Sequence, residues 1–124
     1  MKQTINPEEL KVQLLQFSGT EHYYEHSTIG SGKLLLTDGC KYLREVAKCY
    51  WLFDLFASYQ YKLCNEDFQT WTLVKTKSNG WEVSATDGND KKLVTQYIPF
   101  SDFVIEDGFT IFLTDGVAML PSEY

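Results

Sequence analysis

The sequence predicts an α+β fold in which an N-terminal helix and one long central helix pack on a C-terminal antiparallel β meander of four to five strands. Helical spacing and capping signals occupy the first half of the 124 residues, whereas Asn-Gly and Asp-Gly turns punctuate the second half. Between those turns, apolar and polar residues alternate. Helices followed by strands in sequence are typical of α+β proteins. The length fits a single globular domain, residues 1–124.

The first helix is predicted over about residues 7–17. Asn6 is placed as its N-cap, Pro7 stands at the first helical position, where a missing N–H costs nothing, and Glu9 completes a capping box. An apolar stripe at helical spacing then leads to a glycine stop: Leu10, Leu14, Phe17 and Gly19.

The central helix is predicted to begin after Asp38, its expected N-cap, and to continue to about Leu63. Between Gly39 and Asn65 there is no further glycine and no proline, so helix propensity is favourable throughout. Apolar residues surround the helix nearly completely over residues 50–57. This stretch is therefore covered on more than one side, or its spare face meets another subunit. The segment 18–36 fits either a strand or a helix.

The meander is predicted from alternating segments bounded by turns. Asn79-Gly80 is the strongest hairpin signal, and Asp87-Gly88 and Asp115-Gly116 mark further turns. Pro99 ends a strand or confines it to a sheet edge. The expected strands are residues 68–75, 81–86, 93–98, 109–114 and 117–120.

Composition and charge exclude several classes of function. The net charge of −6 lies entirely in residues 66–124, where ten acidic residues accompany four lysines, and this balance argues against a nucleic-acid partner. The start of the chain lacks an apolar signal region and no long apolar run is present, so we expect a cytoplasmic protein with no membrane partner. No phosphate-binding loop or serine-nucleophile motif is complete, and no cofactor is expected.

The three cysteines, Cys40, Cys49 and Cys64, are odd in number and lack metal-site spacing. We expect reduced and mostly buried thiols, since free cysteine is among the most buried residue types.

Two histidines lie in an H-x-x-E-H pattern, His22 to His26. On a helix, this spacing could hold zinc with the glutamate as general base. The flanking residues leave room for barely two turns of helix, so ordinary packing or hydrogen-bonding histidines are the favoured interpretation. His22 and His26 therefore remain only weak candidates for metal binding or catalysis.

Asp54 is the other candidate catalytic residue, because its sequence neighbours are almost all apolar. Desolvation would disfavour its charged form, and such perturbed groups are enriched at functional sites. The favoured alternative is a structural carboxylate that accepts hydrogen bonds and fixes packing.

Six parts of the chain form a recognisable set of motifs: Phe17–Glu21 with Tyr23-Tyr24, Thr37–Leu43, Tyr50–Asp54, Phe68–Leu73, Ile98–Phe103 and Leu120–Tyr124. Together they resemble a family of small bacterial and phage proteins that form a domain of unknown function. The likeness spans almost the whole chain and implies an intracellular protein, with no activity or site residue to transfer. We also expect the terminal Tyr124 to pack on the body of the domain.

The sequence thus favours a non-catalytic protein-binding or regulatory domain, acting on a protein partner or by self-association as a homodimer. Acidity, aromatic content and the lack of a complete catalytic set support this interpretation. Candidate contact residues are the aromatics Tyr24, Tyr50 and Trp51. The alternative is a small hydrolase-like enzyme that uses Asp54 with His22 or His26.

Overall fold

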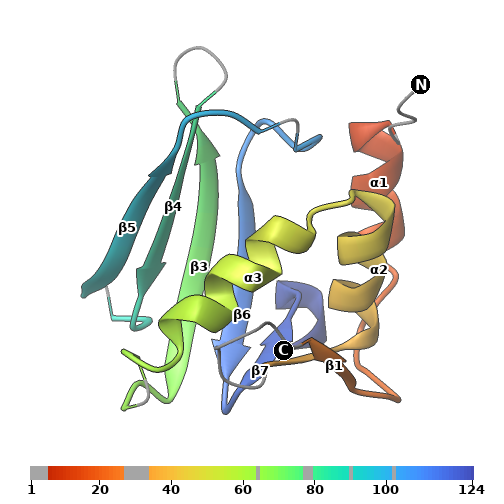
Figure 1. The fold of residues 1–124 in the computed structure, drawn as a ribbon. Helices are drawn as coiled ribbons and strands as arrows, with labels where there is room; N and C mark the ends of the chain where they lie inside the picture. Colours follow the sequence, from red (N-terminus) through yellow and green to blue (C-terminus); the bar gives the residue numbers. More distant parts are fainter. Residues whose placement is uncertain (1–5, 27–33, 64, 77–79, 90, 102) are drawn as a thin grey trace.

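The computed structural model describes residues 6–26, 34–63, 65–76, 80–89, 91–101 and 103–124, and it confirms the α+β class. Among these residues, three α-helices and a short 3-10 helix accompany one seven-stranded mixed sheet (Figure 1). The sheet is larger than the predicted meander. None of the described helices has the length and apolar run that a bilayer crossing requires.

Helix α1 (Pro7–Leu14) begins where the sequence predicts. The Asn6 side-chain oxygen accepts hydrogen bonds from the backbone N–H groups of Glu8 at 2.9 Å and Glu9 at 3.3 Å, as an N-cap does. The helix ends at Leu14, three residues earlier than predicted. Phe17 leaves the helix and packs against Tyr42, with ring centroids 5.5 Å apart.

The predicted long central helix is wrong, because it is broken into α2 (Asp38–Val46) and α3 (Tyr50–Tyr59). Lys48 lies between them with a φ of 54°, a left-handed conformation that ends an α-helix. The break lets the two helices run in different directions (Figure 1). Leu43 of α2 and Phe53 of α3 are therefore both buried in one core.

The N-cap of α2 is also one residue from the predicted position. The Thr37 hydroxyl oxygen, rather than the side chain of Asp38, accepts a hydrogen bond from the backbone N–H of Cys40 at 3.4 Å. Asp38 is the first helical residue, where a carboxylate still interacts favourably with the helix dipole.

Segment 18–36, left undecided by the sequence, contributes two strands to the sheet. Strand β1 (Tyr24–His26) pairs antiparallel with β2 (Leu34–Leu36), and β2 pairs parallel with β7 (Val117–Met119). The remaining strands are β3 (Phe68–Lys75), β4 (Trp81–Thr86), β5 (Lys92–Ile98) and β6 (Phe109–Thr114).

The strand order is β1-β2-β7-β6-β3-β4-β5, so the second half is not a simple meander. Strand β6 returns to pair with β3 rather than with β5. Asp115 and Gly116 have φ values of 53° and 78°, which make the two-residue hairpin turn between β6 and β7. The predicted Asn79-Gly80 turn falls partly outside the described residues, because they omit Asn79.

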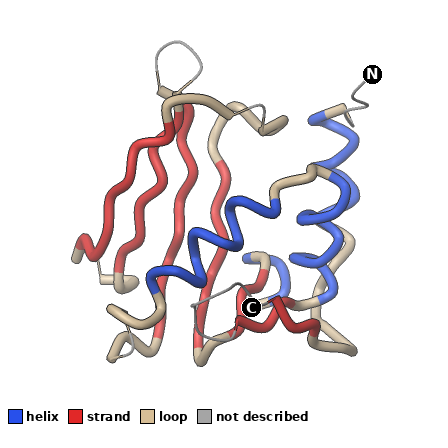
Figure 2. Tube along the Cα trace, in the orientation of Figure 1, coloured by secondary structure: helices blue, strands red, loops and turns tan. Residues whose placement is uncertain are grey.

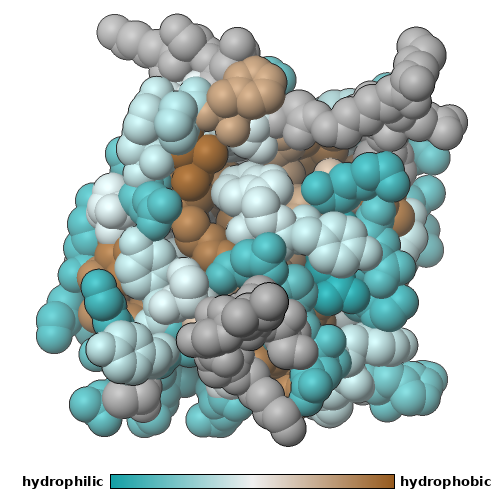
Figure 3. Space-filling view, viewed as in Figure 1, coloured by the Kyte–Doolittle hydropathy of each residue, from teal (hydrophilic) through white to brown (hydrophobic). Residues whose placement is uncertain are grey.

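The core lies between the helices and the sheet and includes buried residues of α1, α2 and α3. Helix α3 runs obliquely across the strands (Figure 2). Phe56 of α3 packs on Trp71 of β3, with ring centroids 4.8 Å apart. The space-filling view from this side shows a strip of apolar surface flanked by polar side chains (Figure 3). Half-buried Val94 and Ile98 are paired with the buried Ala85 and Trp81, so they lie on the helix-bearing face of the sheet.

The chain ends in a 3-10 helix, η1 (Pro121–Glu123), followed by Tyr124. The Tyr124 ring lies 5.5 Å from the ring of Phe68 and 5.4 Å from that of Phe112, in edge-on contacts. The expectation that this residue contacts the domain is met through these two ring contacts, while 73% of the residue stays exposed.

Candidate binding cleft

A cleft of about 360 Å³ separates α1 from the start of β6 and the C-terminal segment. Most of its lining is apolar, and the Leu15 side chain at its edge is 73% exposed. Clefts of this size with apolar walls and a few polar groups are the usual shape of ligand and peptide sites. Its lining residues are Lys11, Leu14, Leu15, Gly108, Phe109, Thr110, Leu120, Pro121 and Ser122.

The cleft runs beside a strand edge that β7 leaves uncovered. Strand β7 pairs with residues 112–114 of β6 only, and the same register continued by two residues would place Pro121 opposite Thr110. Pro121 has no N–H and begins η1 instead of extending the strand. The first half of β6 therefore has β3 on one side and the cleft on the other.

The hydrogen-bonding pattern shows which backbone groups face the cleft. The carbonyl of Ala118 accepts from the N–H of Thr37, so Ala118 faces β2, and its neighbour Met119 faces Phe112 of β6. The N–H and C=O groups of successive residues in a strand point to opposite sides. Thr110 lies two residues before Phe112, so its N–H and C=O point to the same side as those of Phe112, away from β3 and toward the cleft. No described strand pairs with them.

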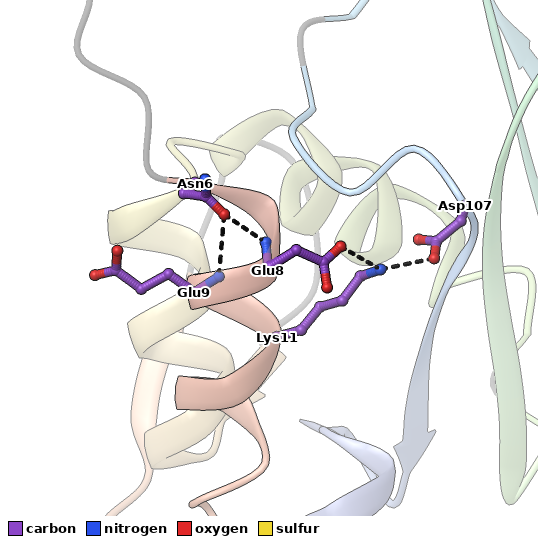
Figure 4. Close-up of polar contacts among 5 residues, drawn as sticks. All are labelled: Asn6, Glu8, Glu9, Lys11 and Asp107. Atoms are coloured by element: carbon purple, nitrogen blue, oxygen red, sulfur yellow. Dashed lines mark hydrogen bonds and ion pairs between the residues drawn. The ribbon is translucent and has the colours of Figure 1, made fainter.

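An ion pair joins the two walls of the cleft (Figure 4). The Lys11 ammonium lies 2.6 Å from the Asp107 carboxylate and 3.5 Å from that of Glu8. The hydrogen bond from Lys11 holds the pKa of Asp107 below its usual value, and the same bond raises the pKa of Lys11. Because Lys11 lines the cleft and Asp107 precedes Gly108, this pair connects α1 to the loop before β6.

Replacing Lys11 with methionine is expected to raise the pKa of Asp107 toward its ordinary value, as followed by carboxyl-carbon NMR titration. The lowered folded-state pKa means that the ion pair favours folding at neutral pH and loses this effect as the pH falls through that pKa. A Lys91→Met variant controls for the loss of a surface charge. Equal Asp107 pKa values in both variants would contradict the assignment.

Asp54 and His26, both candidates from the sequence, are brought together by the fold. The Asp54 carboxylate lies 2.7 Å from Nε2 of His26, and Nη1 of Arg44 lies 2.8 Å from Nδ1 of the same ring. A guanidinium can only donate, so Nδ1 accepts and the ring carries its proton on Nε2, from which it donates to Asp54. Both ring nitrogens are thus occupied.

The surroundings of Asp54 differ from the predicted apolar environment. Its side chain is 53% exposed, whereas the His26 side chain is 5% exposed. Asp54 lies on the solvent side of α3 and accepts the hydrogen bond of a buried imidazole. Through His26, Arg44 and Asp54 the arrangement connects β1, α2 and α3. This agrees with the favoured expectation of a carboxylate that accepts hydrogen bonds and fixes packing.

The zinc interpretation of the H-x-x-E-H pattern is not supported by the local structure. His26 lies in strand β1 and His22 precedes that strand, so the two residues do not share a helix face. Within the described part of the chain, no three histidine, cysteine or acidic residues are grouped as metal ligands would be. His22 lies near Tyr24, with ring centroids 6.4 Å apart.

The two described cysteines, Cys40 and Cys49, are free and buried, as expected. Burial raises the pKa of Cys49 to about 12 and that of Cys40 well above its usual value, so neither provides a thiolate nucleophile at neutral pH. Cys64 lies outside the described residues.

The three aromatic contact candidates occupy different places. Tyr50 is 47% exposed beneath the Arg44 guanidinium, which lies 4.9 Å from its ring centroid, and Trp51 is half-buried. Tyr24 lines a second pocket, on α2. The sequence interpretation missed the cleft residues. One signal was present: Leu15 directly follows Leu14 of the apolar stripe, so it cannot share the core-facing side of that helix.

Comparison with known families identifies a relationship that covers nearly all of this structure. A family model described as a family of unknown function, DUF6876, matches residues 8–124. The chain belongs to this family. The DUF6876 match includes every element that forms the cleft and the His26 cluster. Comparisons of this DUF6876 chain with curated proteins and with solved structures found no match.

Proposed function

We propose that this chain is a non-catalytic domain that binds an extended, apolar segment of a protein partner in the cleft beside β6. The supporting observation is the coincidence of an apolar cavity with an uncovered strand edge. An extended peptide can add to such an edge through main-chain hydrogen bonds, while its alternate side chains enter a neighbouring pocket. Thr110 would supply one N–H and one C=O to the added strand.

The alternative of a hydrolase that uses Asp54 has weaker support. A general base needs a nitrogen free to take a proton from substrate or water, and both nitrogens of His26 already have partners. His22 is exposed and lies outside this cluster. The predicted homodimer through spare helix surface stays a prediction, which light scattering over a range of protein concentrations would test.

The test is a selection of random twelve-residue peptides displayed on phage against the purified full chain. Peptides recovered by this selection are expected to be rich in apolar and β-branched residues and to shift the Thr110 amide resonance in NMR spectra. Leu15→Glu is expected to weaken their binding at least about tenfold, because a carboxylate would enter the apolar cleft.

Val12→Glu is the matched control for this test. Val12 is on the same helix and 59% exposed, but it does not line the cleft. The Val12→Glu variant should therefore bind the selected peptides within about twofold of the wild-type affinity. Failure to select any peptide, or equal affinities in the two variants, would overturn the proposal.

A further inference from the structure

We propose that a second pocket, formed by one face of α2 with Tyr24 of β1 and with Phe17 in the segment that follows α1, binds a small organic cation of the alkylammonium class. The pocket is about 350 Å³ in volume and shares no lining residue with the cleft. Aromatic rings and carboxylates line it together, which is the combination that recognises alkylammonium groups. Its lining residues are Phe17, Tyr24, Asp38, Lys41, Tyr42, Glu45 and Val46.

Helical spacing explains why these groups converge. Lys41 and Tyr42 lie three and four residues after Asp38, and Glu45 lies four and three residues after them, so the four side chains project from one side of α2. Tyr24 of β1 adds its ring beside them, and its interaction with the Asp38 carboxylate raises the pKa of the tyrosine.

The chain already places a cation of its own in this pocket. The Lys41 ammonium lies 5.0 Å from the centroid of the Tyr24 ring and 3.2 Å from the Glu45 carboxylate. It therefore makes both contacts that an alkylammonium ligand would make. Lysine has a flexible four-carbon side chain, so a ligand can displace its ammonium into solvent at modest cost.

Electrostatics favour a cation over an anion. Two carboxylates, Asp38 and Glu45, accompany the single lysine in the lining, and backbone and side-chain hydrogen bonds keep the pKa of each carboxyl below its usual value. Both are therefore ionised at neutral pH. An anionic ligand would face two negative groups, whereas an alkylammonium ligand would replace one positive group with another.

The experiment titrates the full-length protein with choline and, in parallel, with its neutral isostere 3,3-dimethylbutan-1-ol, monitored by amide chemical shifts. Choline is expected to shift the resonances of Tyr24, Tyr42 and Glu45, and the neutral isostere is expected to bind at least about fivefold more weakly. Lys41→Met should tighten choline binding about fivefold, because it removes the internal competitor.

Lys62→Met is the matched control. Lys62 lies over the ring of Tyr59, 6.0 Å from its centroid and outside the pocket, so its removal changes the net charge equally and should leave choline affinity unchanged. Equal binding of choline and the isostere would overturn the proposal, as would an unchanged affinity in Lys41→Met. Loss of choline binding in Tyr24→Leu, checked for an unchanged fold by circular dichroism, would support it.

Discussion

Replacing His26 with leucine is expected to lower the free energy of unfolding by about 3 kcal/mol, measured by urea denaturation. The imidazole is the acceptor for Nη1 of Arg44, whose side chain is only 12% exposed. Within the described residues, the Nε of Arg44 is already buried without a hydrogen-bond partner. Arg44 would keep its contacts with Glu45 and the Tyr50 ring, but its Nη1 would lose the imidazole acceptor in a mostly buried place, which costs more than losing one exposed hydrogen bond.

A double variant separates this cause from a simple loss of packing. When His26→Leu is combined with Arg44→Leu, the mostly buried guanidinium is removed together with its acceptor, and more than half of the lost stability should return. His22→Leu, at the exposed end of the same sequence pattern, is expected to change stability by less than about 0.5 kcal/mol. A His26→Leu protein as stable as His22→Leu would show that the cluster does not hold β1 to the helices.

The outcome also bears on the function of Asp54. The Asp54 carboxylate is half exposed and accepts a hydrogen bond from a histidine whose other nitrogen faces a guanidinium. Such a chain of donors and acceptors fixes the tautomer and position of the ring. The sequence indicated that Asp54 could take part in either catalysis or packing, and the contacts of His26 favour packing.

Local signals in this sequence were reliable because their causes are local. The Asn6 cap depends only on backbone N–H groups two and three residues away. The Asp115-Gly116 turn depends only on residues that tolerate positive φ. The predicted strand over residues 81–86 is confirmed as β4, and its apolar residues Trp81, Val83 and Ala85 are buried. Each of these features could be predicted without knowing the rest of the fold.

The features that were missed depend on contacts far apart in the sequence. No residue near Lys48 in the sequence predicts a helix end there. The chain leaves the helix at Lys48 because α2 and α3 each bury a different face in the same core. Strands β1 and β2 are three residues each. Strand β2 joins the sheet by pairing with β7, some 80 residues further along the chain, and β1 pairs with β2. The cleft follows from the same pairing, since it exists only because β7 stops short of Thr110.

Glu123→Gln is expected to lower the free energy of unfolding by about 2 kcal/mol and the melting temperature by about 8 °C. The Glu123 carboxylate accepts from the Thr37 hydroxyl at 2.6 Å and from the backbone N–H groups of Gly39 and Leu120 at 3.0 Å each. A glutamine amide has one acceptor oxygen and would turn its NH₂ group toward one of these donors. Thr37 and Gly39 lie at the start of α2, where the helix dipole also favours an anion.

The matched control is Glu82→Gln, on an exposed position of β4, which should change the melting temperature by no more than about 2 °C. Gly39→Ala should reproduce the loss, because an added Cβ would lie 2.6 Å from a Glu123 carboxylate oxygen and 2.5 Å from Leu120. Leu120, Pro121 and Ser122 form one wall of the cleft. Loss of the Glu123 hydrogen bonds should therefore also weaken the binding of peptides that occupy the cleft. Thermal unfolding of Glu123→Gln that matches the Glu82→Gln control would show that this carboxylate does not fix the C-terminal segment on α2.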